Sequence, residues 1–568
     1  MSRKRKNNVL DKLHIPRFTH EWVSPSKTRN AMINDYILDW LDIHGEAKGY
    51  IPDTKSDIYD PELDFSKYIM DQGKKFEEYI VKELREKFGK DFVEVTETDN
   101  YKKTDTTISL MKNGTPIIYQ GMVFNPTLKI YGTPDLIVRS DYLNNMVTTP
   151  VVSRYQYGCN FNDYWHYRII DIKFHTLHLK SNFTTICNDD SVRAFKAQCY
   201  LYNRCLHYMQ GFHSRKSYIL GRGWSATKKS VEYVNNNPFN KLGVIDYSNE
   251  DFNICEDALL AAKWYLRVKT DGKNWEMLPT PSIPELYPNM NIMSYKWKTV
   301  KNKIAKELEE LTLIYSCGYY NRVYAHIQKL YKISDPKLTA RSLDIVGKKN
   351  SDLVDGILEA YQEKQKISVD MSNHIKGFFV DIESISSIHN ILDNSDTRVY
   401  MIGVGFFDSE NNWNYKNFLA KQLDEKSETD MFIQFKDYID SFNISVIWHY
   451  NSTDKNELDK LAGRVDDKFM EKYEFKDIYN DLKEGKIFIP GCLNFSLKNI
   501  SKALGCSRYD ESTIQSGSDS IIYGIRYYEK YRSSSSMDYV SYINNVIKYN
   551  EFDCLALSDV VRYISSSR

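Results

Sequence analysis

The sequence predicts an α/β protein of two or three domains, and three observations support this class. The chain has 568 residues, 42% of them hydrophobic, so it is too long for one ordinary core and apolar enough to form several. Short apolar strand patterns alternate with amphipathic helix patterns over 22–278 and again over 371–568. A proline-rich stretch at 279–294 and a largely helical segment at 295–370 separate these two regions.

Composition limits the cellular context and the partners. The 76 Lys and Arg residues balance 76 Asp and Glu residues, so a nucleic-acid partner would have to be bound by local basic patches and metal ions. The nine cysteines are scattered without a C-x-x-C pair, so we expect no disulfides, zinc site or iron–sulfur cluster, and an intracellular, reducing location in the cytoplasm or nucleus. No apolar run reaches the roughly 18 to 20 residues of a membrane span, so we expect no membrane partner. The abundance of Asn, Ile, Lys and Tyr is typical of an AT-rich genome, including viral ones.

The basic start of the chain, MSRKRKNN, lacks the apolar segment of a secretory signal. We predict a disordered tail over 1–21, with a localisation signal or a phosphate-binding arm as the alternatives.

The first strand-rich region opens with a predicted helix over 71–88. Its apolar residues are spaced for one buried face, and Glu77 lies beside that face. The segments PIIYQGMVF and LKIYGTPDLIVR then predict strands, with Gly-Thr-Pro at 132–134 turning the chain before Asp135.

The next strand and helix carry further polar residues. The segment YRIIDIKF predicts an apolar strand that carries Asp171 and Lys173 on one face. In the helix predicted over 192–209, Gln198 and Tyr202 are four residues apart and therefore neighbours.

These residue types fit phosphodiester hydrolysis. Asp135 and Asp171 can hold Mg²⁺ through oxygen, and Lys173 can position a water or stabilise developing negative charge. A lone D-x-K triplet is most often a surface pattern, so the interpretation depends on several motifs that occur in a fixed order along the chain. GTPD, DIK and QCYLY resemble the core of RecB-like PD-(D/E)xK nucleases, which implies a restriction-endonuclease-like fold. The resemblance also implies that Glu77, in GKKFE, is a further metal or water ligand.

The middle of the chain predicts a linker and a helical connector. Four prolines within 279–288 exclude a helix or a central strand there. Over 295–370 the pattern is helical, and a spacer between the neighbouring domains is one interpretation. The alternative is a unit that grips nucleic-acid backbones through basic side chains, which are Lys298, Lys301, Lys303 and Arg322.

The last region, 371–568, starts with the strand GFFVDIESI. Its apolar run ends in Asp381 and Glu383, whose spacing places both carboxylates on one face of a strand. Two carboxylates held together repel each other unless a cation lies between them, so a divalent metal site is predicted. Two solvated acids on an edge strand are the alternative for this pair alone.

The pattern that follows predicts strands over 398–408 and 413–419, a helix over 430–442 and a strand over 445–450. A polar turn after the last strand carries Asp454. A long amphipathic helix is predicted over 539–564, in which Tyr549 and Asp553 share a face.

The four acids in order, with Tyr549 four residues before the last, resemble the DEDD exonuclease superfamily in its tyrosine-bearing (DEDDy) form. Position 548 is Lys548, so the histidine variant is not matched. The resemblance implies an RNase H-like mixed-sheet domain with 3′–5′ exonuclease activity. It further implies two Mg²⁺ or Mn²⁺ ions about 3.5 to 4 Å apart, held by Asp381, Glu383, Asp454 and Asp553, and a water oriented by Tyr549.

The segments HYNSTDKNEL, NFSLKNISKALG and YNEFD resemble the RNase H-like domain of predicted RecB-family nucleases, which join both modules in this order. We therefore expect a metal-dependent nuclease with two centres, acting on DNA in replication, repair or recombination, with RNA as the alternative substrate. Two rival hypotheses stay open. One centre could be a nucleic-acid-binding platform without catalysis, or the protein could be a non-catalytic scaffold.

Overall fold

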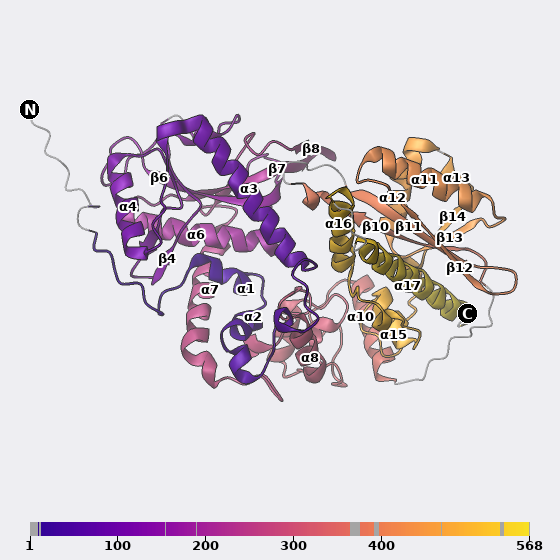
Figure 1. The fold of residues 1–568 in the computed structure, drawn as a ribbon. Helices are drawn as coiled ribbons and strands as arrows, with labels where there is room; N and C mark the ends of the chain where they lie inside the picture. The colour runs from indigo at the N-terminus through magenta and orange to yellow at the C-terminus, as the bar shows by residue number, and fades with distance from the viewer. Residues whose placement is uncertain are drawn as a thin grey trace, which may run out of the picture. The chain divides into compact units, whose positions relative to one another are not determined.

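A computed structural model describes residues 10, 13–153, 155–188, 190–363, 375–390, 397–466, 468–533 and 539–566 (Figure 1). They form two compact units. The described residues of the first unit lie mainly in 13–52 and 70–288, and those of the second in 53–69, 289–363, 375–389 and 397–566. The predicted division into a nuclease domain, a linker and a helical connector stays a prediction. No helix within the described ranges has the length and apolarity needed to cross a membrane.

The first unit is built on a mixed sheet of seven strands. Their order is β1-β2-β5-β6-β7-β8, and β9 also pairs with β7. These strands span Phe92–Glu94 (β1), Ile117–Tyr119 (β2), Leu136–Arg139 (β5), Tyr167–Leu179 (β6), Lys216–Lys228 (β7), Val231–Asn235 (β8) and Gly243–Asp246 (β9). A separate hairpin joins β3 (Val123–Asn125) to β4 (Ile130–Gly132). The chain therefore leaves the hairpin after β4 and enters the large sheet at β5, and the connection between them is the turn that the sequence predicts.

Helices surround this sheet, some packed on its strands and others packed on a neighbouring helix. They include α1 (Arg29–Met32), α2 (Ile37–Trp40), α3 (Phe65–Phe88), α4 (Asn100–Asn113), α5 (Leu143–Met146), α6 (Asp190–Gln210) and α7 (Phe252–Asp271). The apolar stripe Phe76, Ile80 and Leu84 of α3 is fully buried against strands β2, β5 and β6. The helix begins at Phe65, six residues before the predicted start. The helix predicted over 192–209 is confirmed as α6, which is slightly longer than expected.

Asp39 is a buried carboxylic acid in the helical part of the first unit. Asn30 Nδ2 donates to its Oδ1 over 2.9 Å, and Trp264 Nε1 donates to its Oδ2 over 3.0 Å. Burial raises the pKa of Asp39 from 3.8 to about 7, although both hydrogen bonds act in the opposite direction. The folded state therefore keeps a proton that the unfolded chain loses near pH 4.

We expect the free energy of unfolding of the first unit to fall as the pH rises from about 4 to 7. A folded pKa above the unfolded one gives stability that is fully present below the unfolded pKa and is lost as the pH rises through the folded pKa. The slope is at most about 1.4 kcal/mol per pH unit. Urea unfolding at several pH values, followed by tryptophan fluorescence, measures it. Asp39→Asn should make the slope smaller and the exposed control Asp42→Asn should keep it, whereas equal slopes in both would contradict the assignment.

The second unit contains the predicted mixed sheet. Its order is β12-β11-β10-β13-β14. The strands span Phe378–Ile385 (β10), Arg398–Phe407 (β11), Trp413–Leu419 (β12), Val446–His449 (β13) and Glu474–Asp477 (β14). β10, β11 and β12 are antiparallel neighbours, whereas β13 and β14 run parallel to β10. The central strand β10 is the strand that carries Asp381 and Glu383.

Helices cover both faces of this sheet, as Figure 1 shows. They are α11 (Glu425–Asp440), α12 (Ser452–Val465), α13 (Phe469–Lys472), α14 (Ile478–Glu484), α15 (Leu497–Ala503), α16 (Gly517–Ser533) and α17 (Tyr539–Ser566). α11, α12 and α13 pack on one face through a core around Phe378, Phe432 and Leu458. α16 and α17 pack on the other through Tyr400, Ile522 and Val546. The polar turn predicted around Asp454 is wrong, because Asn451 accepts a hydrogen bond from the Thr453 amide and starts helix α12.

Residues 289–363, between the two strand-rich regions, belong to the second unit. They form α8 (Lys298–Leu308), α9 (Tyr319–Ile327) and α10 (Lys348–Gln362). Leu353 and Ile357 of α10 pack in one core with Ile478 and Val560. α10 is therefore an integral part of the folded unit.

Two of the four lysines and arginines considered as phosphate contacts are buried. The Arg322 guanidinium donates to Glu310 Oε1 over 2.9 Å, with both side chains almost fully buried. Lys301 donates to the carbonyl oxygen of Ile292. The interpretation of Lys301 and Arg322 as phosphate contacts is therefore wrong, while Lys303 is exposed and Lys298 is half-buried.

Candidate active sites

Three carboxylates meet at the centre of the second unit. One oxygen of each of Asp381, Glu383 and Asp553 lies within 4.8 Å of the others. Strand β10 supplies the first two from one face, as the two-residue period of a strand predicts. Helix α17 supplies Asp553 from a position about 170 residues further along the chain. Glu383 and Asp553 are 6% and 8% exposed, whereas Asp381 is more open.

Neighbouring polar side chains hold each of these acids. Asn550 Nδ2 donates to Asp381 Oδ2 over 2.6 Å, and the Ser520 hydroxyl donates to Glu383 Oε2 over 2.5 Å. The Tyr509 hydroxyl donates to Asp553 Oδ1. Such bonds fix the directions of the carboxylates before any ligand arrives.

A glycine on the neighbouring strand makes room for one of these partners. Gly403 of β11 pairs directly with Asp381, and a Cβ at this position would lie 1.6 Å from Asn550 Oδ1. Tyr415 donates to the same oxygen over 2.8 Å. Only glycine at position 403 lets Asn550 reach Asp381.

Asp454 faces the same group from the first turn of α12. It is 8% exposed, and burial followed by the charges of Glu383 and Asp553 raises its pKa. It is not part of the group within 4.8 Å. The structure therefore brings all four predicted acids close enough to interact, with three in direct convergence.

The acids crowd one another electrostatically. Burial and then the charges of Asp553, Glu383 and Asp454 raise the pKa of Asp381. Burial raises the pKa of Glu383 to about 8, and the charge of Asp553 adds to this effect. Carboxylates with mutually raised pKa values in a buried group are the arrangement that a divalent cation relieves. Oxygen donors in this number match Mg²⁺ or Mn²⁺, so the residues fit the metal that the sequence predicts.

Tyr549 lies beside Asp553, as predicted, and a lysine that sequence reasoning missed lies on its ring. Lys498 Nζ is 4.5 Å from the ring centre of Tyr549 and 4.7 Å from that of Tyr509. This Nζ is buried and has no hydrogen-bond partner among the described residues. Burial lowers the pKa of Lys498, while the charge of Asp553 opposes the shift.

A second group of polar residues gathers in the first unit, where β5 and β6 pair. The register places Leu136 opposite Ile170, so Asp135 comes next to Asp171 across the two strands. The Ile172 amide donates to Asp135 Oδ2 over 2.7 Å, and Lys173 Nζ lies 2.6 Å from Asp171 Oδ2. Both oxygens of Asp171 are buried and accept no hydrogen bond of good geometry within the described residues.

The remaining predicted residues lie at the same place. Tyr119 and Gln120 donate to Glu77 Oε1 over 2.9 and 3.1 Å. Gln198 Nε2 donates to the Tyr202 hydroxyl over 3.4 Å. Glycine is needed here too, because a Cβ at Gly132 would lie 2.9 Å from Cε1 of Tyr202.

Charge couples the members of this second group. Burial and then the charges of Asp171 and Glu77 raise the pKa of Asp135, whereas Lys173 lowers it. Burial alone would lower the pKa of Lys173, but the charges of Asp171 and Asp135 outweigh it and raise the pKa. Two buried carboxylates with one ammonium leave a net negative charge that a cation would balance, so these residues also fit a divalent metal.

Comparison with known proteins bears on the second unit. Residues 378–565 match the family model of the RNase H superfamily. No curated protein and no solved structure matches the chain. The match covers the whole sheet of the second unit and all four acids that meet on it. Residues 378–565 therefore form a domain of the RNase H superfamily.

Proposed function

We propose that the protein is a metal-dependent nuclease whose RNase H-like domain removes nucleotides from the 3′ end of a strand. The convergence of Asp381, Glu383 and Asp553 within 4.8 Å in a domain of this superfamily carries the proposal. Divalent cations bound there supply Lewis acidity and a water that is nucleophilic near neutral pH. Asn550, Ser520 and Tyr509 hold the carboxylates in position. Tyr549, beside Asp553, orients the attacking water.

A second centre in the first unit has its own support. The charges of Asp171 and Glu77 raise the pKa of Asp135, and Lys173 contacts Asp171. This is the arrangement that the resemblance to RecB-like PD-(D/E)xK nucleases implies. In this proposal the acids hold the metal, Lys173 stabilises charge on the phosphate, and Gln198 and Tyr202 support the acids from α6. The rival for this site is a nucleic-acid-binding platform without catalysis.

One experiment tests the proposal as a whole. Purified protein is incubated with end-labelled single-stranded and double-stranded DNA and RNA, with Mg²⁺, with Mn²⁺ or with EDTA. We expect metal-dependent release of mononucleotides from a 3′-labelled strand, with DNA as the preferred substrate in keeping with a role in replication, repair or recombination. Binding without release under every metal condition would favour the scaffold hypothesis instead.

Lys498 gives a sharper test of the exonuclease centre. A buried ammonium beside Asp553 can stabilise negative charge on the scissile phosphate, so Lys498→Met should lower kcat by about 100-fold. The affinity for Mn²⁺, measured by calorimetry, should stay the same or rise, because a positive charge near the acids is removed. Lys498→Arg should restore part of kcat. Lys502→Met, on the exposed face of the same helix, is the matched control. Equal losses of kcat and metal affinity would indicate a purely structural role.

A further inference from the structure

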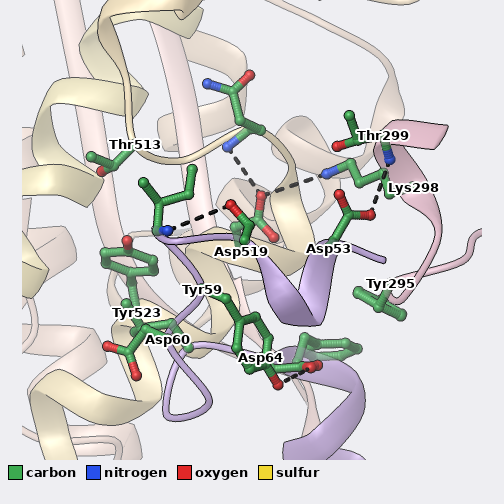
Figure 2. Close-up of a pocket in the computed structure, with 15 residues that line it drawn as sticks. Asp53, Tyr59, Asp60, Asp64, Tyr295, Lys298, Thr299, Thr513, Asp519 and Tyr523 are labelled. Carbon is green, nitrogen blue, oxygen red and sulfur yellow. Dashed lines mark hydrogen bonds and ion pairs between the residues drawn. The ribbon is translucent and has the colours of Figure 1, made fainter. Parts of the chain in front are cut away.

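The second unit contains a cavity of about 300 Å³ that the proposed chemistry does not use. Three segments line it: residues 53–65, which we call the strap; the start of α8 with Tyr295; and residues 513–523 at the start of α16. Figure 2 shows the side chains that face the cavity. The strap and α8 lie outside 378–565, so most of this wall belongs to this chain and not to the RNase H superfamily match.

The strap is held firmly against the rest of the second unit. The Thr299 amide donates to Asp53 Oδ2 over 3.0 Å, and the Asp53 amide donates to the carbonyl oxygen of Lys296 over 2.8 Å. At the other end, Arg526 Nε donates to the carbonyl oxygen of Glu62 over 2.7 Å. Lys530 pairs with the Glu62 carboxylate over 2.9 Å. The cavity is therefore preformed.

Aromatic rings and carboxylates share the wall. The rings are those of Tyr59, Phe65, Tyr295 and Tyr523, and the carboxylates are those of Asp53, Asp60, Asp64 and Asp519. Burial raises the pKa of Tyr523, and the charges of Asp519 and Asp60 add to this effect. Rings of this kind offer stacking surfaces to a nucleobase. Carboxylate oxygens accept hydrogen bonds from exocyclic amino groups.

The charge of the wall selects the part of a nucleotide that can enter. Among the described residues that line the cavity, Lys298 is the single cationic side chain, and it lies 3.9 Å from Asp519. Four carboxylates therefore face one ammonium, and a phosphate is repelled from the interior. A neutral, flat group with N–H donors is accepted. Lys298, at one side of the cavity, is placed to bind the phosphates of the same strand.

A short stretch of chain connects the cavity to the acids of the exonuclease centre. Asp519 precedes Ser520, whose hydroxyl holds Glu383. Gln515 Nε2 donates to the carbonyl oxygen of Tyr509, whose hydroxyl holds Asp553. Lys298 is also close enough to Lys498 for the two charges to repel each other. The short segment 509–520 therefore contacts both the cavity and the acids of the exonuclease centre. Lys298 and Lys498 lie near each other.

We propose that this cavity binds a nucleobase of the substrate strand close to the scissile phosphate, and that it prefers bases with an exocyclic amino group over thymine or uracil. The proposal rests on the nuclease function proposed above. Lys298 and Lys498 bind the phosphates between this base and the acids. Tyr523 and Tyr295 stack on the base. Asp60 and Asp519 accept the amino group. The site sets which 3′ ends are held, whereas the acids carry out cleavage.

The test measures binding by the full chain in the presence of Ca²⁺, with fluorescently labelled oligo(dC) and oligo(dT). Tyr523→Leu should raise the dissociation constant for oligo(dC) by about tenfold, as expected for the loss of one stacked base. Asp60→Asn should shrink the preference for oligo(dC) over oligo(dT). Tyr527→Leu removes a tyrosine one turn further along α16, outside the lining, and should leave both values unchanged.

The location is checked by photo-crosslinking of an oligonucleotide that carries 5-iodocytosine, which keeps the exocyclic amino group, near its 3′ end. Crosslinks that map to Tyr295 or Tyr523 support the proposal. Equal affinities for Tyr523→Leu and Tyr527→Leu, with crosslinks elsewhere, overturn it. Competition for the cavity by spermidine, without any effect of Tyr523→Leu on oligonucleotide binding, also overturns it and assigns the acidic wall to an organic cation.

A small ester separates this proposal from the nuclease function. Thymidine 5′-phosphate p-nitrophenyl ester reaches the acids without a neighbouring base. Its hydrolysis by wild type and by Tyr523→Leu at equal rates, with weaker strand binding by the variant, supports both ideas. If the ester is hydrolysed but wild type and Tyr523→Leu bind the strand with equal affinity, only the cavity proposal fails. If neither ester nor strand is cleaved and binding still depends on Tyr523, the nuclease function fails and the cavity stays a base-binding site.

Discussion

Asp381→Asn will abolish the release of nucleotides from 3′ ends, with a loss on the order of 10³-fold or more. Asp381 stands at the middle of the acid group. Asn550 donates a hydrogen bond to it, and Gly403 leaves the space that Asn550 needs. Metal ions contribute several kcal/mol of charge stabilisation to such reactions, and each 1.36 kcal/mol is a factor of ten in rate. The change from carboxylate to amide removes one charge and keeps the shape. Release of mononucleotides from a 3′-labelled strand measures the effect.

Calorimetric titration with Mn²⁺ should show weaker binding by the same variant and by Asp553→Asn. Glu551→Gln is the matched control, because Glu551 lies on the same helix and accepts a hydrogen bond from Trp413, which glutamine can also do. It should keep wild-type rates. Unchanged Mn²⁺ affinity in both Asp variants would show that the acids are solvated carboxylates without a metal role.

The second large effect concerns Lys173 in the first unit. Closed circular single-stranded DNA has no 3′ end, so only a centre other than the exonuclease can open it. We expect metal-dependent opening of the circle by wild type and by Asp381→Asn, and its loss by at least about 100-fold in Lys173→Met. The reason is the position of the ammonium, 2.6 Å from Asp171 in a buried group of acids.

Removing one partner of a buried ion pair also costs about 3 to 5 kcal/mol of stability, so Lys173→Met may be compared only after its folding is checked by thermal unfolding. Asp171→Asn provides a second variant with less disturbance. Lys216→Met removes a half-exposed lysine of β7 that pairs with Asp246, and it should open circles at the normal rate. Circles that stay intact with wild-type protein, but still bind to it, would favour the binding-platform hypothesis for this unit.

Sequence patterns predicted the parts of the fold that depend on local periodicity. Strand β10 and helices α6 and α17 were recognisable because their apolar residues repeat with the period of one element. The two groups of acids were recognisable because carboxylates stand at strand ends and on helix faces in a fixed order. Asp454 was assigned to a turn, because the N-terminal cap at Asn451 was not recognised as the start of a helix.

The residues that hold the acids could not be found in this way. Tyr509 and Ser520 lie in a stretch whose polar residues have no distinctive spacing, and their partners are 44 and 137 positions away. Asn550 carried a weak signal, since it lies three residues before Asp553 on the same helix. Lys498 lay within a recognised segment, but only the packing of α15 against Tyr509 and Tyr549 reveals its position.

The strap has a practical consequence for dividing the protein. Residues 53–69 fold with the second unit although the chain on either side of them folds with the first. A gene fragment that starts at residue 289 would encode the entire RNase H-like sheet but not the strap. It would remove Tyr68 from the core around Ile522 and Tyr528 and leave Arg526 and Lys530 without Glu62. Excision of the RNase H-like domain by a single cut is therefore expected to give an unstable product, whereas supplying 53–69 through a short designed loop should restore its solubility.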